Sequence, residues 1–305
     1  MSAVLERAVT PFDLADDRAY RIWRDAKLAS VPRRVDPLIV DVRDPARLDE
    51  AERSALLDRC ARHNMAVYRC ALPVADAAVV RRLGEQLGLT RLDANWLADE
   101  DGLSRVTVGG GRDGSADHGG FIPYTDRPIR WHTDGYYHPG ERRIRAMILH
   151  CVRPAASGGV NRLIDHELAY IAIRDASPRW MMALMAPDAM TIPAREDPGG
   201  VARPAQTGPV FSVDPVDGRL HMRYTARTRS IAWAPGAATA KAVAFLAQWL
   251  ASGAALTLRL GAGMGIVANN VLHDRSAFVD DPLAPRLLYR ARYLDRVGGA
   301  AWRNG

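Results

Sequence analysis

His132 and Asp134 lie two positions apart in the segment IRWHTDGYY, which has the residue types of a β-strand. Residues i and i+2 of a strand project from the same face, so this imidazole and this carboxylate are expected side by side. Such a pair supplies two neighbouring ligands to a metal ion. One more histidine from elsewhere in the chain would complete a 2-His-1-carboxylate triad, which leaves open positions on Fe(II) for oxygen and a co-substrate.

A second pattern, near the C-terminus, consists of arginines. Arg286, Arg290 and Arg292 share strand parity in RLLYRARYLDRV, so one strand face would carry three guanidinium groups. One interpretation is a solvated edge strand whose charges discourage aggregation. The same face also holds Leu288, and the stretch is rich in Leu and Tyr, which favours a partly buried strand. Buried arginines need anionic partners.

Taken together, these residues resemble the pattern of the Fe(II)/2-oxoglutarate-dependent dioxygenases. His132-Thr-Asp134 is followed 139 residues after Asp134 by His273, and Arg286 comes 13 residues later. The long span is typical of the taurine dioxygenase/TfdA (clavaminate-synthase-like) branch, which has helical insertions between the two histidines. The segment GGVNRL falls where this branch commonly has Gly-Gly-acid-Thr. The resemblance covers roughly residues 36 to 297.

The resemblance implies a role for each of these residues. His132, Asp134 and His273 match the iron ligands, and Arg286 matches the arginine that binds the distal carboxylate of 2-oxoglutarate. Asn161 stands where the family usually has a threonine that contacts 2-oxoglutarate; an amide can also hydrogen-bond a carboxylate. The implied cofactors are Fe(II), 2-oxoglutarate as co-substrate and O2. The implied reaction hydroxylates or otherwise oxidises a small molecule and releases succinate and CO2.

Three further residues are candidates for contact with the substrate. Arg290 lies four residues beyond Arg286 on the same strand face, about 13 Å along an extended strand. An arginine buried there favours a substrate that carries a carboxylate, sulfonate or similar anion. The alternative is that Arg290 pairs with Asp280 or Asp281 and never meets the substrate. Tyr136 and Tyr137 follow the His-Thr-Asp motif directly, and either could line the pocket or pack within the strand layer.

The resemblance also leaves a second function class open. A jelly-roll protein can keep the scaffold and bind a ligand without turnover, which would make this chain a catalytically silent binding protein. Slow release of succinate without added substrate would distinguish the enzyme from that alternative.

Helices and strands alternate in the first part of the chain, whereas short strands dominate from Ile129 onward. The patterns predict strands at 37–42 and 65–70 and helices at 44–63 and 74–88. Two later helical segments, 167–176 and 238–251, interrupt the short strands. Many short strands separated by turns favour a β-sandwich or jelly roll. We therefore predict a mixed α/β fold whose double-stranded β-helix (jelly-roll) core carries flanking helices and helical insertions.

The domain organisation follows from this division. No composition shift or linker divides the chain, so a single dioxygenase domain is expected over residues 1–305. Its parts would be an N-terminal extension (1–36), an α/β N-terminal part (37–128) and a jelly-roll core with insertions (129–297). The glycine-rich loop 109–128 is either a lid over the iron or a surface loop.

Composition and charge argue against several other classes. The formal net charge is +6, but basic residues are interleaved with acids, so we expect no nucleic-acid partner. No apolar stretch reaches the roughly 18–20 residues of a membrane helix, so we expect no membrane partner. Three cysteines without a C-x-x-C pair indicate a reducing, cytoplasmic location. The expected partner is a small-molecule substrate, and homo-oligomerisation stays open.

Overall fold

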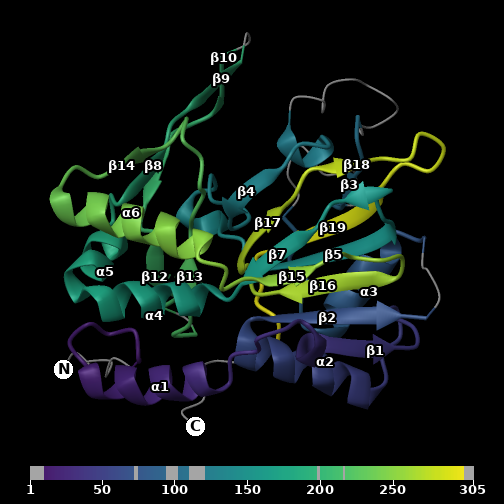
Figure 1. Ribbon diagram of the computed structural model, residues 1–305, viewed down its shortest axis with the longest axis horizontal. Coiled ribbons are helices and arrows are strands. Elements are labelled where there is room, and N and C mark those ends of the chain that lie inside the picture. Colours follow the sequence, from purple (N-terminus) through teal and green to yellow (C-terminus); the bar gives the residue numbers. More distant parts are fainter. Residues whose placement is uncertain are drawn as a thin grey trace, which may run out of the picture.

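Two facing sheets form the centre of the computed structural model, which describes residues 10–71, 75–93, 102–109, 121–197, 200–215 and 217–298 (Figure 1). The larger sheet has the order β1-β2-β16-β5-β19-β3 and the smaller one the order β15-β7-β17-β4. The β1–β2 pair is parallel and the other pairs are antiparallel. This arrangement is a double-stranded β-helix, and the predicted fold class is confirmed.

The strands of the two sheets have the following bounds. The larger sheet contains β1 (Ile39–Val42), β2 (Met65–Cys70), β3 (Ser104–Val106), β5 (Ala146–Arg153), β16 (Met264–Ala268) and β19 (Leu287–Tyr293). The smaller sheet contains β4 (Ile129–His132), β7 (Asn161–Ile164), β15 (Leu256–Leu258) and β17 (Leu272–Arg275). A short pair, β6 (Ser157–Gly158) and β18 (Phe278–Val279), extends beside them.

Apolar side chains from both sheets fill the space between them. Leu163 of β7 and Leu258 of β15 pack there with Val67 of β2, Ile266 of β16 and Leu288 of β19. On the other face of the larger sheet, a second apolar cluster packs under helices α2 (Glu50–His63) and α3 (Ala78–Gln86). Because the larger sheet is covered on both faces, most residues of its central strands β2 and β5 are buried.

The insertion between β7 and β15 forms a third apolar cluster, to the left of the sheets in Figure 1. It contains α4 (His166–Ala176), α5 (Pro178–Met185), α6 (Ala237–Ala251), and the strands β8 (Met190–Ile192), β9 (Arg195–Asp197), β10 (Gly200–Arg203), β11 (Gln206–Gly208), β12 (Phe211–Val213), β13 (Leu220–Met222) and β14 (Ala232–Trp233). The helical insertions predicted from the sequence are therefore present, and α5 adds a helix that the pattern did not reveal.

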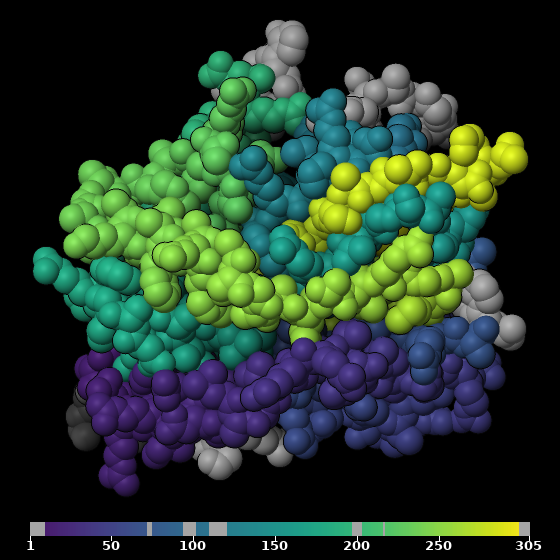
Figure 2. Space-filling view, in the orientation of Figure 1, coloured from purple at the N-terminus to yellow at the C-terminus, as the bar shows by residue number. Residues whose placement is uncertain are grey.

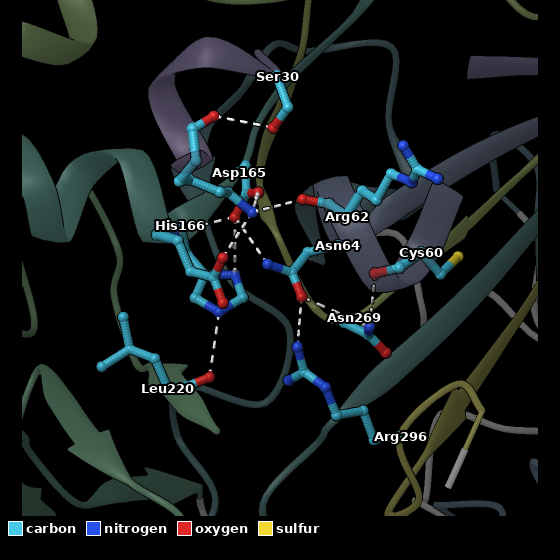
Figure 3. Close-up of polar contacts among 11 residues, drawn as sticks. Ser30, Cys60, Arg62, Asn64, Asp165, His166, Leu220, Asn269 and Arg296 are labelled. Atoms are coloured by element: carbon cyan, nitrogen blue, oxygen red, sulfur yellow. Dashed lines mark hydrogen bonds and ion pairs between the residues drawn. The ribbon is translucent and has the colours of Figure 1, made fainter. Parts of the chain in front are cut away.

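The N-terminal segment forms helix α1 (Asp17–Ala29), which runs beneath the insertion and toward α2 (Figures 1 and 2). Its Lys27 is buried, and the Nζ atom lies 2.5 Å from a carboxylate oxygen of Asp165 and 2.5 Å from one of Glu167. Asn64 donates a hydrogen bond of 2.9 Å to Asp165 (Figure 3). These contacts join α1, the end of α2 and the start of α4, so the extension is an integral part of the fold.

One predicted boundary is wrong. The helix expected from residue 44 begins at Glu50, because Asp49 caps it and forms a capping box with Glu52. Of the predicted loop 109–128, residues 110–120 lie outside the described residues, so its role as a lid stays a prediction. Within the described residues, no helix is both long and apolar enough to cross a membrane. Cys60, Cys70 and Cys151 are free and buried, as expected without a disulfide scaffold.

Candidate metal centre and co-substrate pocket

His132, Asp134 and His273 come together at one end of the smaller sheet. His273 on β17 is the register partner of His132 on β4, and their ring centroids are 4.2 Å apart. One potential ligand atom from each of the three residues lies within 4.8 Å of the others. The sequence reasoning thus selected residues that the fold places around one point.

The route by which Asp134 reaches this point differs from the prediction. Strand β4 ends at His132, so Asp134 does not project from the same strand face but from the turn that follows. Thr133 exchanges hydrogen bonds with Tyr224 from the insertion, and Gly135 has a φ of 67°. The left-handed glycine lets the chain turn sharply here. Asp134 is therefore held by a turn and not by strand parity.

Asn270, which sequence reasoning did not identify, fixes that turn. It lies between β16 and β17 with a φ of 52°, and its carboxamide is buried. The Oδ1 atom accepts a 2.7 Å hydrogen bond from the Asp134 backbone N–H, and Nδ2 donates to the carbonyl oxygens of Asp134 (2.9 Å) and Ile144 (2.8 Å). The only signal in the sequence is an Asn-Asn pair three residues before His273, which is typical of turns.

Both histidines present the same ring nitrogen to the centre. Nδ1 of His132 donates to the Arg130 carbonyl and Nδ1 of His273 donates to the Val271 carbonyl, each at 2.9 Å. A carbonyl oxygen can only accept, so in each neutral ring Nε2 carries the free lone pair. Burial, together with the neighbouring His273 ring, lowers the pKa of His132 to about 3. The ring is therefore neutral at physiological pH, as a metal ligand must be.

The Asp134 carboxylate is ionised and incompletely satisfied. Burial is the largest single influence and raises its pKa, but the charges of Arg290, Arg292 and the two neighbouring histidines together outweigh it and hold the pKa well below its usual range. Arg290 Nη1 lies 3.8 Å from Oδ1, whereas the buried Oδ2 has no hydrogen-bond partner among the described residues. Two imidazole nitrogens and an orphaned carboxylate oxygen form the donor set that suits Fe(II). The residues present therefore fit an iron ion.

Arg286 lines a separate, small cavity together with Asn161, Cys151 and Gly159. The residue is buried, and burial lowers its pKa to about 10, so it remains a cation at neutral pH. Its backbone N–H bonds to Asp280, but its guanidinium has no carboxylate partner among the described residues. A buried guanidinium in this position is suited to bind the carboxylate of an incoming ligand.

Asn161 and His273 lie on the same side of the smaller sheet. His273 pairs with Leu163, and Asn161 is two residues from Leu163 on β7. Leu163 packs into the space between the sheets, so Asn161 and His273 also face inward. Along β19 the inward positions are Arg290, Arg292 and Leu288, while Tyr289 and Ala291 pack under α3. The cavity of Arg286 and the histidine–aspartate cluster thus open on the same inter-sheet space.

The edge-strand interpretation of the arginines is therefore wrong, because β19 lies between β5 and β3. Arg292 is buried and its Nη2 lies 2.8 Å from a carboxylate oxygen of Asp93, which also accepts a 2.7 Å bond from Arg142. Arg290 does not pair with Asp280 or Asp281; the carboxylate beside it belongs to Asp134.

The two tyrosines differ in their surroundings. Tyr136 is buried in the apolar cluster of the insertion, and its ring meets that of His132 edge to face at a centroid distance of 6.4 Å. The Tyr137 hydroxyl accepts a 2.9 Å hydrogen bond from Arg292. Packing thus accounts for Tyr136, while Tyr137 belongs to the charged network behind the cluster.

Comparison with known proteins adds an independent observation. The family model described as "Taurine catabolism dioxygenase TauD, TfdA family" matches residues 27–292. A uridine-5'-phosphate dioxygenase from an Amycolatopsis species is 34% identical over 173 residues, which is 54% of this chain and 60% of that protein. One from a Streptomyces species is 31% identical over 209 residues, 65% of this chain and 70% of that protein. The match thus spans less than two thirds of the first relative.

Solved structures agree on the fold. Asparagine oxygenase in complex with Fe(II), hydroxyasparagine and succinate has a TM-score of 0.59 at 17% identity, over 96% of this chain and 87% of that one. The non-heme iron oxygenase OrfP in complex with Fe and alpha-ketoglutaric acid has a TM-score of 0.58 at 18% identity, over 82% and 81%. At such identities the likeness shows a shared fold.

Proposed function

Because the chain belongs to the TauD/TfdA dioxygenase family, with Fe(II) and 2-oxoglutarate as its cofactors, we propose that it hydroxylates or otherwise oxidises a small anionic molecule. Succinate and CO2 are the proposed co-products. His132, Asp134 and His273 are the proposed iron ligands. When bound, the iron supplies activation of O2 with electrons from 2-oxoglutarate.

One observation carries the proposal. The cluster combines two imidazoles, whose Nδ1 atoms are committed to carbonyls, with a buried carboxylate oxygen that lacks a hydrogen-bond partner among the described residues. Removing a carboxylate from water without pairing it costs several kcal/mol, so such an oxygen is retained where a cation will meet it. Neither a purely structural histidine pair nor a surface acid would show this combination.

The remaining residues of the site bind and orient. Arg286 is the proposed partner of the distal carboxylate of 2-oxoglutarate, since a planar guanidinium matches a carboxylate with two hydrogen bonds. Asn161, on the wall of the same cavity, is the proposed second contact. Arg290, which is largely buried beside Asp134, is the proposed contact for a substrate anion. Tyr137 is hydrogen-bonded to Arg292, the next inward-facing residue on β19, and is the proposed neighbouring contact.

Nucleoside monophosphates are the substrate class to test first. Both similar curated proteins are named for their action on uridine 5'-phosphate, a small molecule with a phosphate anion. The cation-rich inter-sheet space of this chain suits such a charge. Three free, buried cysteines support our further proposal that the protein works in the reducing cytoplasm.

The test measures O2 consumption and succinate formation by the Fe(II)-loaded protein with 2-oxoglutarate. We expect slow succinate formation without substrate and faster, coupled formation with uridine 5'-phosphate or a related anion. If His273→Ala forms succinate as fast as the parent protein, the assigned ligand set is wrong. If neutral analogues such as uridine are oxidised as well as the phosphate, the anionic-substrate proposal fails while the dioxygenase assignment stands.

A further inference from the structure

A second cleft borders Asp134 on the side of the insertion. Its walls are the turn after β4, strand β11 and the β12–β13 hairpin, and its volume is about 490 Å³, part of it open to solvent. Since Asp134 lines the cleft, a ligand bound there would lie next to the proposed iron ligands.

The cleft is built around an arginine that is not free to bind anything else. Arg223 donates to the carbonyl oxygens of Tyr136 (2.7 Å), Met190 (3.0 Å), Gln206 (2.7 Å) and Gly208 (3.3 Å). These bonds connect the turn after β4 with β8 and β11. The guanidinium therefore fixes the cleft walls relative to one another.

Two other basic side chains in the cleft are uncommitted. Arg143 is half-buried, and among the described residues its guanidinium has no hydrogen bond or ion pair. Two residues along, Arg145 is fully engaged, with bonds of 2.5 and 2.8 Å to Asp214 and one of 3.0 Å to the Leu294 carbonyl. His221 on β13 also lacks a hydrogen bond within the described part of the chain. Arg145 therefore occupies the nearby Asp214 carboxylate, which Arg143 does not contact.

Hydroxyl groups complete the lining. Ser212 is the direct register partner of His221 on the β12–β13 hairpin, and Thr207 lies on β11. A guanidinium, an imidazole and hydroxyls form a donor set for the several oxygens of a phosphate. The carboxylate on the wall, Asp134, is the one we assign to iron, so the anion would not face an uncompensated negative charge.

We propose that this cleft is a phosphate subsite, in which Arg143 and His221 bind the phosphomonoester of the small-molecule substrate. The proposal rests on the proposed function, because it assumes that the ligand is a substrate oxidised beside Asp134. It assigns the phosphate to a different place from Arg290, whose nearest carboxylate is Asp134 itself. Arg290 would then face the part of the substrate nearer the iron. Burial and the nearby Arg143 lower the pKa of His221, so its neutral ring would donate one hydrogen bond.

Binding measurements test the subsite. Isothermal titration calorimetry under anaerobic conditions, on protein loaded with Fe(II) and 2-oxoglutarate, would use three probes: uridine 5'-phosphate, uridine and inorganic phosphate. We compare the parent protein with Arg143→Gln and with Arg179→Gln, a matched loss of charge at an exposed position on α5. Arg143→Gln should weaken binding of uridine 5'-phosphate about 10- to 100-fold, with uridine unaffected, and Arg179→Gln should behave like the parent.

The outcomes separate this inference from the proposed function. Inorganic phosphate that binds as tightly as uridine 5'-phosphate would mean a free-anion site, which overturns the substrate subsite. Equal affinity of Arg143→Gln and the parent for uridine 5'-phosphate would also overturn it. Succinate release without substrate is measured on the same samples. If succinate release persists while no phosphate probe binds, the subsite proposal fails and the dioxygenase proposal stands. If succinate release is absent but Arg143→Gln still weakens binding of uridine 5'-phosphate, the dioxygenase proposal fails and the phosphate site stands.

Discussion

Asn270 offers the sharpest test of how this fold holds its candidate metal centre. Its carboxamide makes three buried hydrogen bonds, two of them to the backbone of Asp134 and one to Ile144. We choose Asn270→Gly, because glycine adopts the φ of 52° without strain and the substitution then removes only the side chain.

The expected magnitude follows from the three bonds. Each is worth about 1 kcal/mol net, and a buried partner left unpaired costs about 1–3 kcal/mol. The flexibility of glycine in the unfolded chain adds about 0.5–1 kcal/mol. We therefore expect the free energy of unfolding of the metal-free protein to fall by about 3–5 kcal/mol. Because the Asp134 turn loses its support, Fe(II) affinity should fall about 10- to 100-fold.

The matched control is Asn269→Gly, one residue earlier. Asn269 is also buried, but its bonds reach Cys60 (3.4 Å) and Val297 (3.0 Å), away from Asp134. Urea unfolding measures stability, and the visible band of the anaerobic Fe(II)–2-oxoglutarate complex measures iron binding. Both variants should lose stability, but only Asn270→Gly should lose iron affinity. Equal iron affinity in the two variants would refute the assigned role of Asn270.

The remaining predictions concern charge. Arg286→Gln should raise the 2-oxoglutarate concentration needed for half-maximal activity roughly 30- to several-thousand-fold, for a lost contact of about 2–5 kcal/mol, and should leave iron binding intact. Arg286→Lys should restore 2-oxoglutarate binding only in part, and full restoration by lysine would contradict a bidentate contact. If Arg290 contacts the substrate anion, Arg290→Gln should reduce the preference for an anionic over a neutral substrate in competition assays. If the cleft of Arg143 binds that anion instead, the preference should stay unchanged in Arg290→Gln and fall in Arg143→Gln. Burial lowers the pKa of His166 below 6.5, so the unfolded chain takes up this proton first and stability should fall as pH drops from about 7 to 5. His166 contributes up to about 1.4 kcal/mol per pH unit to that fall, and the other buried histidines with lowered pKa values add to it. His166→Gln should therefore reduce the slope in urea titrations by its own share, and an unchanged slope would contradict this contribution.

The sequence predicts those residues of the site whose roles follow from a sequence pattern, and not those whose roles depend on contacts with distant segments. His132, Asp134 and His273 were accessible because their types and order form a recognisable pattern, and Arg286 because its distance from His273 is part of it. The inward orientation of the arginines followed from strand parity. The two-sheet fold followed from the density of short strands.

Other features depend on contacts between segments distant in sequence, which no local pattern records. Helix α1 forms in a polar stretch because Lys27 finds Asp165 and Glu167 more than a hundred residues away. Asp134 leaves its strand because Asn270 and Tyr224 hold the turn. The alternative that pairs Arg290 with Asp280 or Asp281 is wrong, because it was based on nearness in sequence alone and the carboxylate beside Arg290 belongs to Asp134.

The inward face of β19 shows how the charges of the site divide. Arg290 and Arg292 on that face, and Arg286 just before the strand begins, differ in how far the protein satisfies them. Arg292 has a close, buried partner in Asp93 at 2.8 Å, Arg290 has only the distant Asp134 at 3.8 Å, and the guanidinium of Arg286 has no carboxylate among the described residues. A buried guanidinium costs free energy unless an anion meets it. The incompletely satisfied positions are therefore those where an outside anion is needed, and the fully paired Arg292 holds the network behind them in place.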